Sequence, residues 1–268
     1  MYTEFRYPLF KIVPGARCIE VRIRCRVDVI SDVMEVIGKY LLSPAIMEVK
    51  NDILEIVGFI NVTNVDEEKL LNTLKGLNGV VGVEYISSEL HERGYCFDHF
   101  YYPHICGDYW RMILIIGDRF IEAMVALRDK LGTALDAVLY HIGFWYGYTS
   151  AENMKKILGT RGFLNIVQNI KLVTEYFAHV SRVCGWADIE IVKINPLASE
   201  ALFRASNCWE ADSYLQLFGR SNRPVCHMTR GTIAGVASSV LGRDMVCEEI
   251  QCRAMGSTHC MFRVKPVK

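Results

Sequence analysis

The chain has 268 residues, 51% of them hydrophobic and 22% charged, and its 30 basic residues balance 30 acidic ones. This balance gives no overall attraction to polyanions, so we expect no direct nucleic-acid partner. The N-terminus lacks a signal-peptide pattern and no apolar run reaches the ~20 residues of a membrane span, so we expect a cytoplasmic protein without a membrane span.

The first ninety residues show the order of a small α+β domain. The predicted elements are a strand over 17–26, a helix over 28–40, two strands within 45–64, a helix from 66 and a strand over 80–87. The two central strands meet at Asn51 and Asp52, a polar pair typical of a tight turn. This βαββαβ order predicts four strands with both helices on one face. The layout resembles ferredoxin-like and ACT-type modules, so we assign residues 1–90 to a regulatory or dimerisation domain.

The rest of the chain is predicted to form a linker and a second domain. Residues 91–110 interrupt the periodicity with aromatic residues, two glycines and a proline, which indicates a linker. Residues 111–268 are predicted to form a mixed α/β domain in which helices pack on an antiparallel sheet. Its predicted elements are helices over 118–130, 131–148 and 162–184, strands over 188–195 and 199–209, a helix over 224–241 and two strands within 244–264.

A cluster of metal-ligating residue types occurs near the C-terminus. Cys252 and Cys260 lie four residues to either side of Gly256, so a hairpin that turns near this glycine brings both thiols together. Glu249 lies just before this pair, and Cys226 lies at the start of the preceding helix, from where it can fold over the strands. Three thiolates and one carboxylate suit zinc, and four protein ligands leave no open position for catalysis. We therefore predict a structural zinc site.

The other cysteines offer one alternative ligand. A conventional four-cysteine site would use the Cys247 thiol in place of the Glu249 carboxylate, whereas the symmetry about Gly256 favours Glu249. In a reducing compartment we expect buried thiols and a metal site, and no disulfide framework. The separate cysteines are predicted to be buried structural residues: Cys18, Cys25, Cys184 and Cys208.

This C-terminal spacing resembles the vinyl-4-reductase domain family. The resemblance rests on Cys226, Gly231, Gly235, Glu249, Cys252, Gly256, Cys260 and Phe262. It covers about residues 110–265 and is strongest toward the C-terminus. The family includes a protein associated with bacteriochlorophyll vinyl reduction and the aromatic-sensing domains of certain bacterial transcriptional activators, and a related fold occurs in vesicle-tethering subunits. The resemblance implies that the matching positions bind zinc and that a nearby pocket binds a phenol-like effector.

Aromatic residues on one predicted helix are candidates for that pocket. His141, Trp145 and Tyr148 fall at positions i, i+4 and i+7, which lie on one helix face. Trp209 is a fourth amphipathic candidate. These residues predict a pocket for a small apolar or aromatic molecule, although such a stripe also fits an ordinary packed core.

The function we expect is binding. The chain contains no Ser-His-Asp arrangement, phosphate loop, dinucleotide fingerprint or HExxH motif, so catalysis has little sequence support. Our leading hypothesis is a zinc-containing, homodimeric small-molecule sensor or carrier with a regulatory role. One alternative is a reductase or accessory factor that acts on a tetrapyrrole-like substrate, which the family name suggests. Another is a subunit that only binds other proteins, as the tethering relatives suggest.

Overall fold

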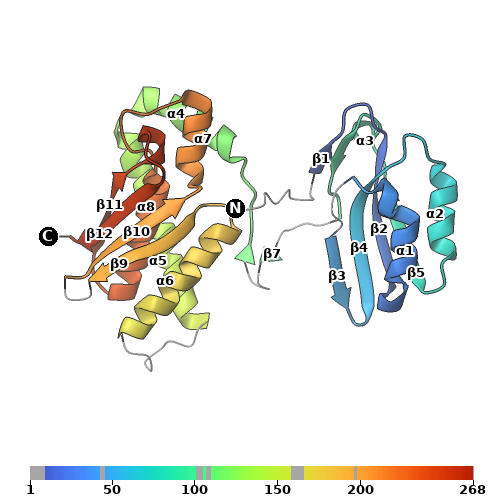
Figure 1. The fold of residues 1–268 in the computed structure, drawn as a ribbon, viewed down its shortest axis with the longest axis horizontal. Helices are drawn as coiled ribbons and strands as arrows, with labels where there is room; N and C mark the ends of the chain where they lie inside the picture. Colours follow the sequence, from blue (N-terminus) through green and yellow to red (C-terminus); the bar gives the residue numbers. More distant parts are fainter. Residues whose placement is uncertain are drawn as a thin grey trace. The chain divides into compact units, whose positions relative to one another are not determined.

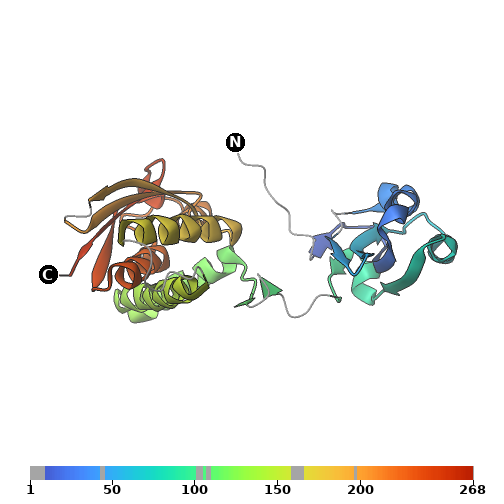
Figure 2. The same ribbon diagram turned by 90° about the horizontal axis from the view of Figure 1, so that it is seen from below.

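A computed structural model describes residues 10–42, 46–100, 105–106, 110–157, 166–195 and 198–267. The chain divides into two compact units, Met1–Ile113 and Leu114–Lys268, and Figures 1 and 2 show the elements of each. Both units combine helices with antiparallel sheet, which confirms the predicted α+β class. Within the described ranges, no helix is both long and apolar enough to cross a membrane.

The first unit contains the predicted βαββαβ order. Its strands are β1 (Phe10–Ile12), β2 (Cys18–Arg26), β3 (Ile46–Lys50), β4 (Ile53–Asn61), β5 (Val80–Ile86), β6 (Tyr95–Phe97), β7 (Ile105–Cys106) and β8 (Trp110–Arg111), and its α-helices are α1 (Ile30–Ile37), α2 (Glu67–Gly76) and α3 (Glu89–Glu92). The main sheet has the order β3-β4-β2-β5, with all neighbours antiparallel. Residues 28–40, predicted as one helix, form α1 flanked by two 3-10 turns, Val27–Val29 and Gly38–Tyr40.

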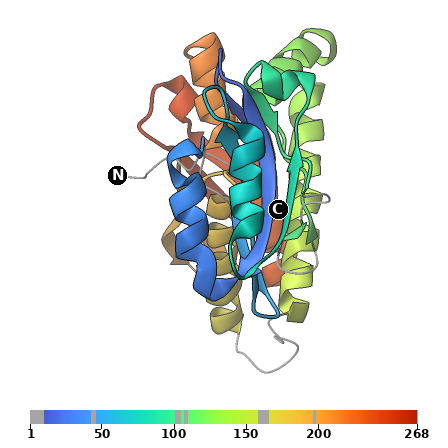
Figure 3. The ribbon, with the colours of Figure 1, turned by 90° about the vertical axis from the view of Figure 1, so that its right-hand side faces the viewer.

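Alternation along β2 decides which face of this sheet is covered. Ile19, Val21 and Ile23 are fully buried, and they form one core with the apolar faces of α1 and α2. Figure 3 shows both helices on the same side of the sheet. The predicted turn is also present, because Asn51 and Asp52 both have positive φ and join β3 to β4 directly.

The segment predicted as a linker belongs in part to the first unit. Strand β6 pairs with β1, and Cys96 forms a disulfide with Cys18 across 78 residues of sequence. The expectation that Cys18 is an unpaired structural thiol is therefore wrong. Strands β2 and β6 bring the two Cα atoms to 6.8 Å, a separation that permits a disulfide. Both cysteines are fully buried beside Phe59.

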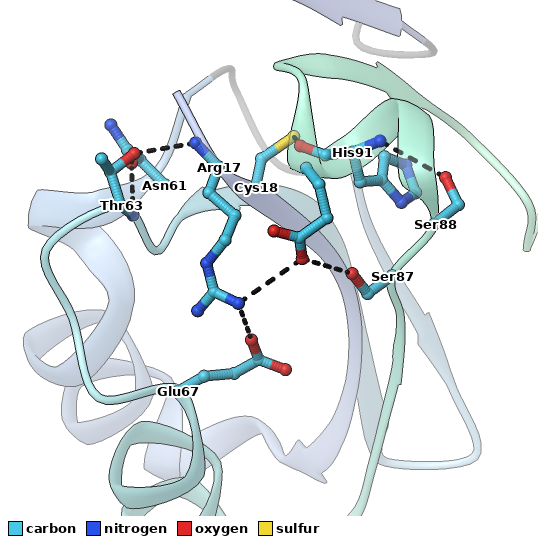
Figure 4. A network of polar contacts seen from close by, with 9 residues as sticks. Arg17, Cys18, Asn61, Thr63, Glu67, Ser87, Ser88 and His91 are labelled. Carbon is cyan, nitrogen blue, oxygen red and sulfur yellow. Dashed lines mark hydrogen bonds and ion pairs between the residues drawn. The ribbon is translucent and has the colours of Figure 1, made fainter. Parts of the chain in front are cut away.

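A polar network joins the start of β2 to the helices around it (Figure 4). The Arg17 guanidinium lies 3.1 Å from a Glu67 carboxylate oxygen of α2 and 3.4 Å from one of Glu92 in α3. The Arg17 N–H donates to Thr63 Oγ1 over 2.8 Å. One side chain thus links β2, α2 and α3, although each ion pair is partly exposed and contributes little by itself.

The second unit packs helices on a four-stranded antiparallel sheet. Its elements are α4 (Gly117–Leu131), α5 (Ala134–Ile157), α6 (Ile166–Val183), β9 (Asp188–Asn195), β10 (Glu200–Ser206), α7 (Trp209–Phe218), α8 (His227–Leu241), β11 (Met245–Gln251) and β12 (Cys260–Pro266). The sheet order is β11-β12-β10-β9. Helix α7 was not predicted, because its first residues were assigned to the end of the preceding strand.

Helices α5 and α8 cross at close range through paired glycines. The glycines are Gly143 and Gly147 in α5 and Gly231 and Gly235 in α8. A Cβ atom at Gly147 would overlap the carbonyl oxygen of Thr232, and one at Gly235 would overlap that of Phe144. The glycine-rich helix of the sequence motif is therefore needed for backbone-to-backbone approach, and it holds α8 beside the sheet.

Candidate metal centre and adjoining pocket

The four predicted metal ligands lie together. Cys226 precedes α8, Glu249 lies near the end of β11, Cys252 follows that strand, and Cys260 begins β12. One donor atom from each lies within 4.8 Å of the other three. The Cys226 and Cys260 Sγ atoms are 3.7 Å apart, close to the ~3.8 Å edge of a tetrahedral shell with zinc–sulfur bonds of ~2.3 Å. The donor set and its spacing fit a zinc ion.

Local backbone features aim these side chains at one point. The strand pairing shifts register between Glu249 and Gln251, and a 3-10 turn, Arg253–Met255, follows Cys252. Gly256 then takes φ of 105°, a conformation that favours glycine, so the chain turns back toward β12. The predicted reversal at this glycine is confirmed.

The Glu249 carboxylate has one oxygen in use and one free. Its Oε2 accepts the Cys226 N–H over 3.0 Å, whereas its buried Oε1 has no hydrogen-bond partner among the described residues. Burial, and then the charge of Cys252, raises the pKa of Glu249 to about 9. A buried carboxylate oxygen without a partner is costly, and a cation at this point would remove that cost.

The thiols share their protons unequally. Hydrogen bonds from Cys226 and Cys260 lower the pKa of Cys252, and burial raises the pKa of Cys226. One thiolate is therefore stabilised by two neighbouring thiols in the metal-free cluster. Because a metal binds thiolates and carboxylates, its binding here would release protons and would strengthen as pH rises.

Two other cysteines differ from expectation in their surroundings. Cys247 is buried in β11, and the groups of potential metal ligands in the described chain do not include it. Cys208, predicted to be a filler, has its Sγ 3.6 Å from that of Cys226 and forms a second potential ligand group with Glu210 and Cys226. Sequence reasoning missed Cys208 because it missed α7. The acidic residues just after Cys208 are the signal of a helix start that could have found it.

A small pocket adjoins the metal group, on the side where Val225 and His227 flank Cys226. Its apolar wall comes from α4, α5 and α7 and includes Phe120, Ile121, Met124, Leu135, Leu139 and Trp209. The free space is about 400 Å³ when the open mouth is counted, but only about 30 Å³ is wide enough for a water molecule. The smaller figure describes the enclosed part, so an aromatic ring would need the wall to move.

Buried polar groups line one part of this pocket. Arg128 forms an ion pair with Asp136, whose Oδ1 is also 3.2 Å from His227 Nε2. Burial, and then the charges of Arg230, Arg128 and Arg223, lowers the pKa of His227 to about 3, so its ring is neutral at ordinary pH. Three buried nitrogens have no hydrogen-bond partner in the described part of the chain: Arg128 Nε, Trp209 Nε1 and His227 Nδ1.

Glu210 connects the pocket to α8. Its two carboxylate oxygens accept the N–H groups of Met228 and Thr229 over 3.0 and 2.8 Å, so it caps the first turn of α8. Burial, and then the charge of Cys208, raises the pKa of Glu210 to about 8. This residue fixes α7 against the start of α8 and so keeps Trp209 at the pocket.

The four predicted ligand-binding residues separate in the structure. Trp209 lines the pocket, whereas His141, Trp145 and Tyr148 are not among its lining residues. Trp145 is 60% exposed, and His141 is exposed beside it. The helical spacing correctly put these residues on one face of α5, but the glycines of α5 turn the opposite face toward α8.

Comparison with known proteins identifies the C-terminal region. Residues 206–266 match the vinyl-4-reductase (4VR) domain. They contain the cysteines and the glutamate of the metal group, and the match confirms the resemblance to this family. The phenol regulator MopR of Acinetobacter guillouiae is 37% identical over 65 residues, which are 24% of this chain and 12% of that protein. An uncharacterized protein of Methanocaldococcus jannaschii is 40% identical over 45 residues, which are 17% of this chain and 25% of that protein.

The matched stretches thus span only a small part of the length of these two relatives. Among solved structures, the phenol-responsive sensory domain of the transcription activator PoxR, determined with phenol, is similar with a TM-score of 0.52. It is 23% identical, and the similarity covers 59% of this chain and 77% of that one. At this identity the likeness establishes a shared fold.

Proposed function

We propose that residues 114–268 form a regulatory domain that binds a small aromatic molecule. The observation that carries the proposal is the pocket beside the metal group, which combines an apolar wall with buried nitrogens that lack partners among the described residues. Ligand pockets commonly have this composition, because apolar walls supply affinity and a few polar groups fix orientation. The fold shared with a phenol-responsive sensory domain and the match to the vinyl-4-reductase domain support the same proposal.

The pocket must widen before it holds a ring. Met124 and Met228 both line it, and methionine side chains are unbranched and adapt easily to a new occupant. We propose that the ligand displaces them. Binding would then be coupled to a change in how α4 packs on α7, which is a route from ligand to regulation.

The proposal is tested by calorimetric titration of the full chain with phenol, benzyl alcohol, benzoate and cyclohexanol. We expect saturable binding of at least one aromatic compound, and weaker binding in a Leu139→Trp variant that fills the pocket. A Leu127→Trp variant is the control, because Leu127 lies on α4 outside the pocket and is 38% exposed. If no compound binds, or if both variants behave alike, the proposed function is wrong.

We further propose that Cys226, Glu249, Cys252 and Cys260 bind one structural zinc ion. The fit of donor types and spacing supports this, as does the unpartnered Glu249 oxygen within the described chain. The ion would join the start of α8 to β11 and β12, and so fix the floor beside the pocket. With four protein ligands it would serve the fold and not catalysis. We propose a regulatory or dimerisation role for the first unit.

A further inference from the structure

The polar part of the pocket presents donors without acceptors. The indole N–H of Trp209 and the Nε–H of Arg128 are buried and have no partner within the described ranges. Both groups can only donate, because neither an indole nitrogen nor a guanidinium accepts a hydrogen bond. Leaving two buried donors unpaired is costly, so this site is completed by an acceptor from outside the chain.

The surrounding charge selects an anion as that acceptor. The positive charges of Arg223 and Arg230 act on His227 together with that of Arg128. The two nearby carboxyl groups are already bound, Asp136 to the Arg128 Nη2 group and Glu210 to the N–H groups that open α8. Arg128 is therefore held in place through Nη2, while its Nε–H stays free for a ligand.

We propose that the ligand of this pocket is an aromatic carboxylate. Its ring packs against Phe120 and Leu139, and its carboxylate accepts hydrogen bonds from Trp209 Nε1 and Arg128 Nε. The inference rests on the proposed function and narrows its ligand from aromatic molecules in general to aromatic acids. A hydrogen bond between a cation and a carboxylate is about twice as strong as a neutral one, so the charge is the main source of selectivity.

The test compares benzoate with benzamide, which has the same shape and no charge, and with phenol, by calorimetric titration of the full chain. We expect benzoate to bind at least about tenfold more tightly than benzamide, as a charge-assisted hydrogen bond implies. Equal affinities for benzoate and benzamide would overturn the inference and leave the proposed function intact. If none of the three compounds binds, the proposed function itself fails.

Variants assign the selectivity to named groups. Arg128→Met should abolish the preference for benzoate, and Arg119→Met should preserve it, because Arg119 lies on the same helix with its side chain 71% exposed. Since Arg128→Met leaves Asp136 without its partner, the double variant Arg128→Met/Asp136→Asn and the single variant Trp209→Phe repeat the test. A preference that survives all three of these variants would show that the carboxylate binds elsewhere, which overturns the inference.

Discussion

At the residue scale, unpaired buried groups distinguish the sites of this protein from its ordinary core. Glu249 Oε1 faces three thiols, and Glu20 Oε1 lies buried in the first unit, both without hydrogen-bond partners in the described chain. Such atoms are rare in native structures because each costs free energy. Each of them therefore gives a measurable consequence.

Replacing one thiol of the metal group should remove the metal and destabilise the second unit. We expect Cys252→Ser to lose bound zinc, as measured by elemental analysis, and to unfold at a clearly lower temperature, because structural zinc supplies folding free energy. Cys184→Ser is the control, since Cys184 is a free, half-buried cysteine just after the C-terminal end of α6. A Cys252→Ser protein that keeps both its zinc and its melting temperature would show that the ligand set is wrong.

The alternative ligand is tested in the same way. Cys247→Ala should retain zinc, because Cys247 is absent from the potential ligand groups of the described chain. Some loss of stability is expected from the small cavity in β11. Loss of zinc in Cys247→Ala together with its retention in Glu249→Gln would assign the fourth position to the thiol.

Glu20 should make the stability of the first unit depend on pH. Burial, and then a hydrogen bond with Asp98, raises the pKa of Glu20 from 4.5 to about 8. Because the folded-state pKa is raised, its contribution to stability is full below pH 4.5 and is lost as pH rises through about 8. Glu20→Gln should flatten this decline in urea unfolding measured at several pH values. Glu35→Gln, at an exposed position of α1, should leave it unchanged. A wild-type profile that rises over this range relative to Glu20→Gln would contradict the assignment.

At the element scale, the crossing of α5 and α8 sets the geometry of the second unit. The two glycine pairs bring the helix backbones together, and this approach holds Cys226 at the N-terminal end of α8 over the strands that carry the other ligands. Helix α7 contributes Trp209 and Glu210, so the pocket exists only where α7 meets α4 and the start of α8. Packing between elements therefore places the site residues.

A single methyl group should disturb this crossing. We expect Gly147→Ala to destabilise the second unit by about 1–3 kcal/mol or more, because the new Cβ would overlap the α8 backbone. Gly76→Ala is the matched control in α2, where no described atom lies within 4 Å of the added Cβ and alanine favours helix. Thermal unfolding followed by circular dichroism measures both. Equal melting temperatures for the two variants would show that the helices can separate freely.

At the scale of the whole molecule, each of the two units has its own core. Buried residues of the first unit cluster around β2 and α1, and those of the second around β10, β12 and α8. The exposed face of α5 adds an apolar surface, with Val138, Ile142 and Trp145 exposed by 49%, 52% and 60%. Apolar residues gathered on one helix face favour self-association.

The predicted homodimer would use this surface. We expect light scattering after size-exclusion chromatography to give twice the mass of the chain, and Trp145→Glu to give the single mass, because a buried charge opposes association. Val183→Glu is the control, since Val183 is 79% exposed at the end of α6. A wild-type protein of single mass would remove the homodimer, and a dimer that survives Trp145→Glu would place its interface elsewhere.

Local pattern in the sequence was enough for the parts of this protein that depend on neighbouring residues. The turn at Asn51 and Asp52, the alternation of β2 and the reversal at Gly256 follow from short-range preferences, and all three were predicted. The grouping of Glu249 with Cys260 follows from the same reversal, because one hairpin brings both to the same place.

Tertiary structure alone decided the features that join distant segments. The disulfide between Cys18 and Cys96 spans 78 residues, the pocket draws on α4, α5, α7 and α8, and Cys208 reaches Cys226 from the start of the unpredicted helix α7. Spacing along α5 showed that His141, Trp145 and Tyr148 share a face, but which face is covered depends on the glycines and on α8. Periodicity fixes relations within one element, whereas the partner of each face is set by packing among all of them.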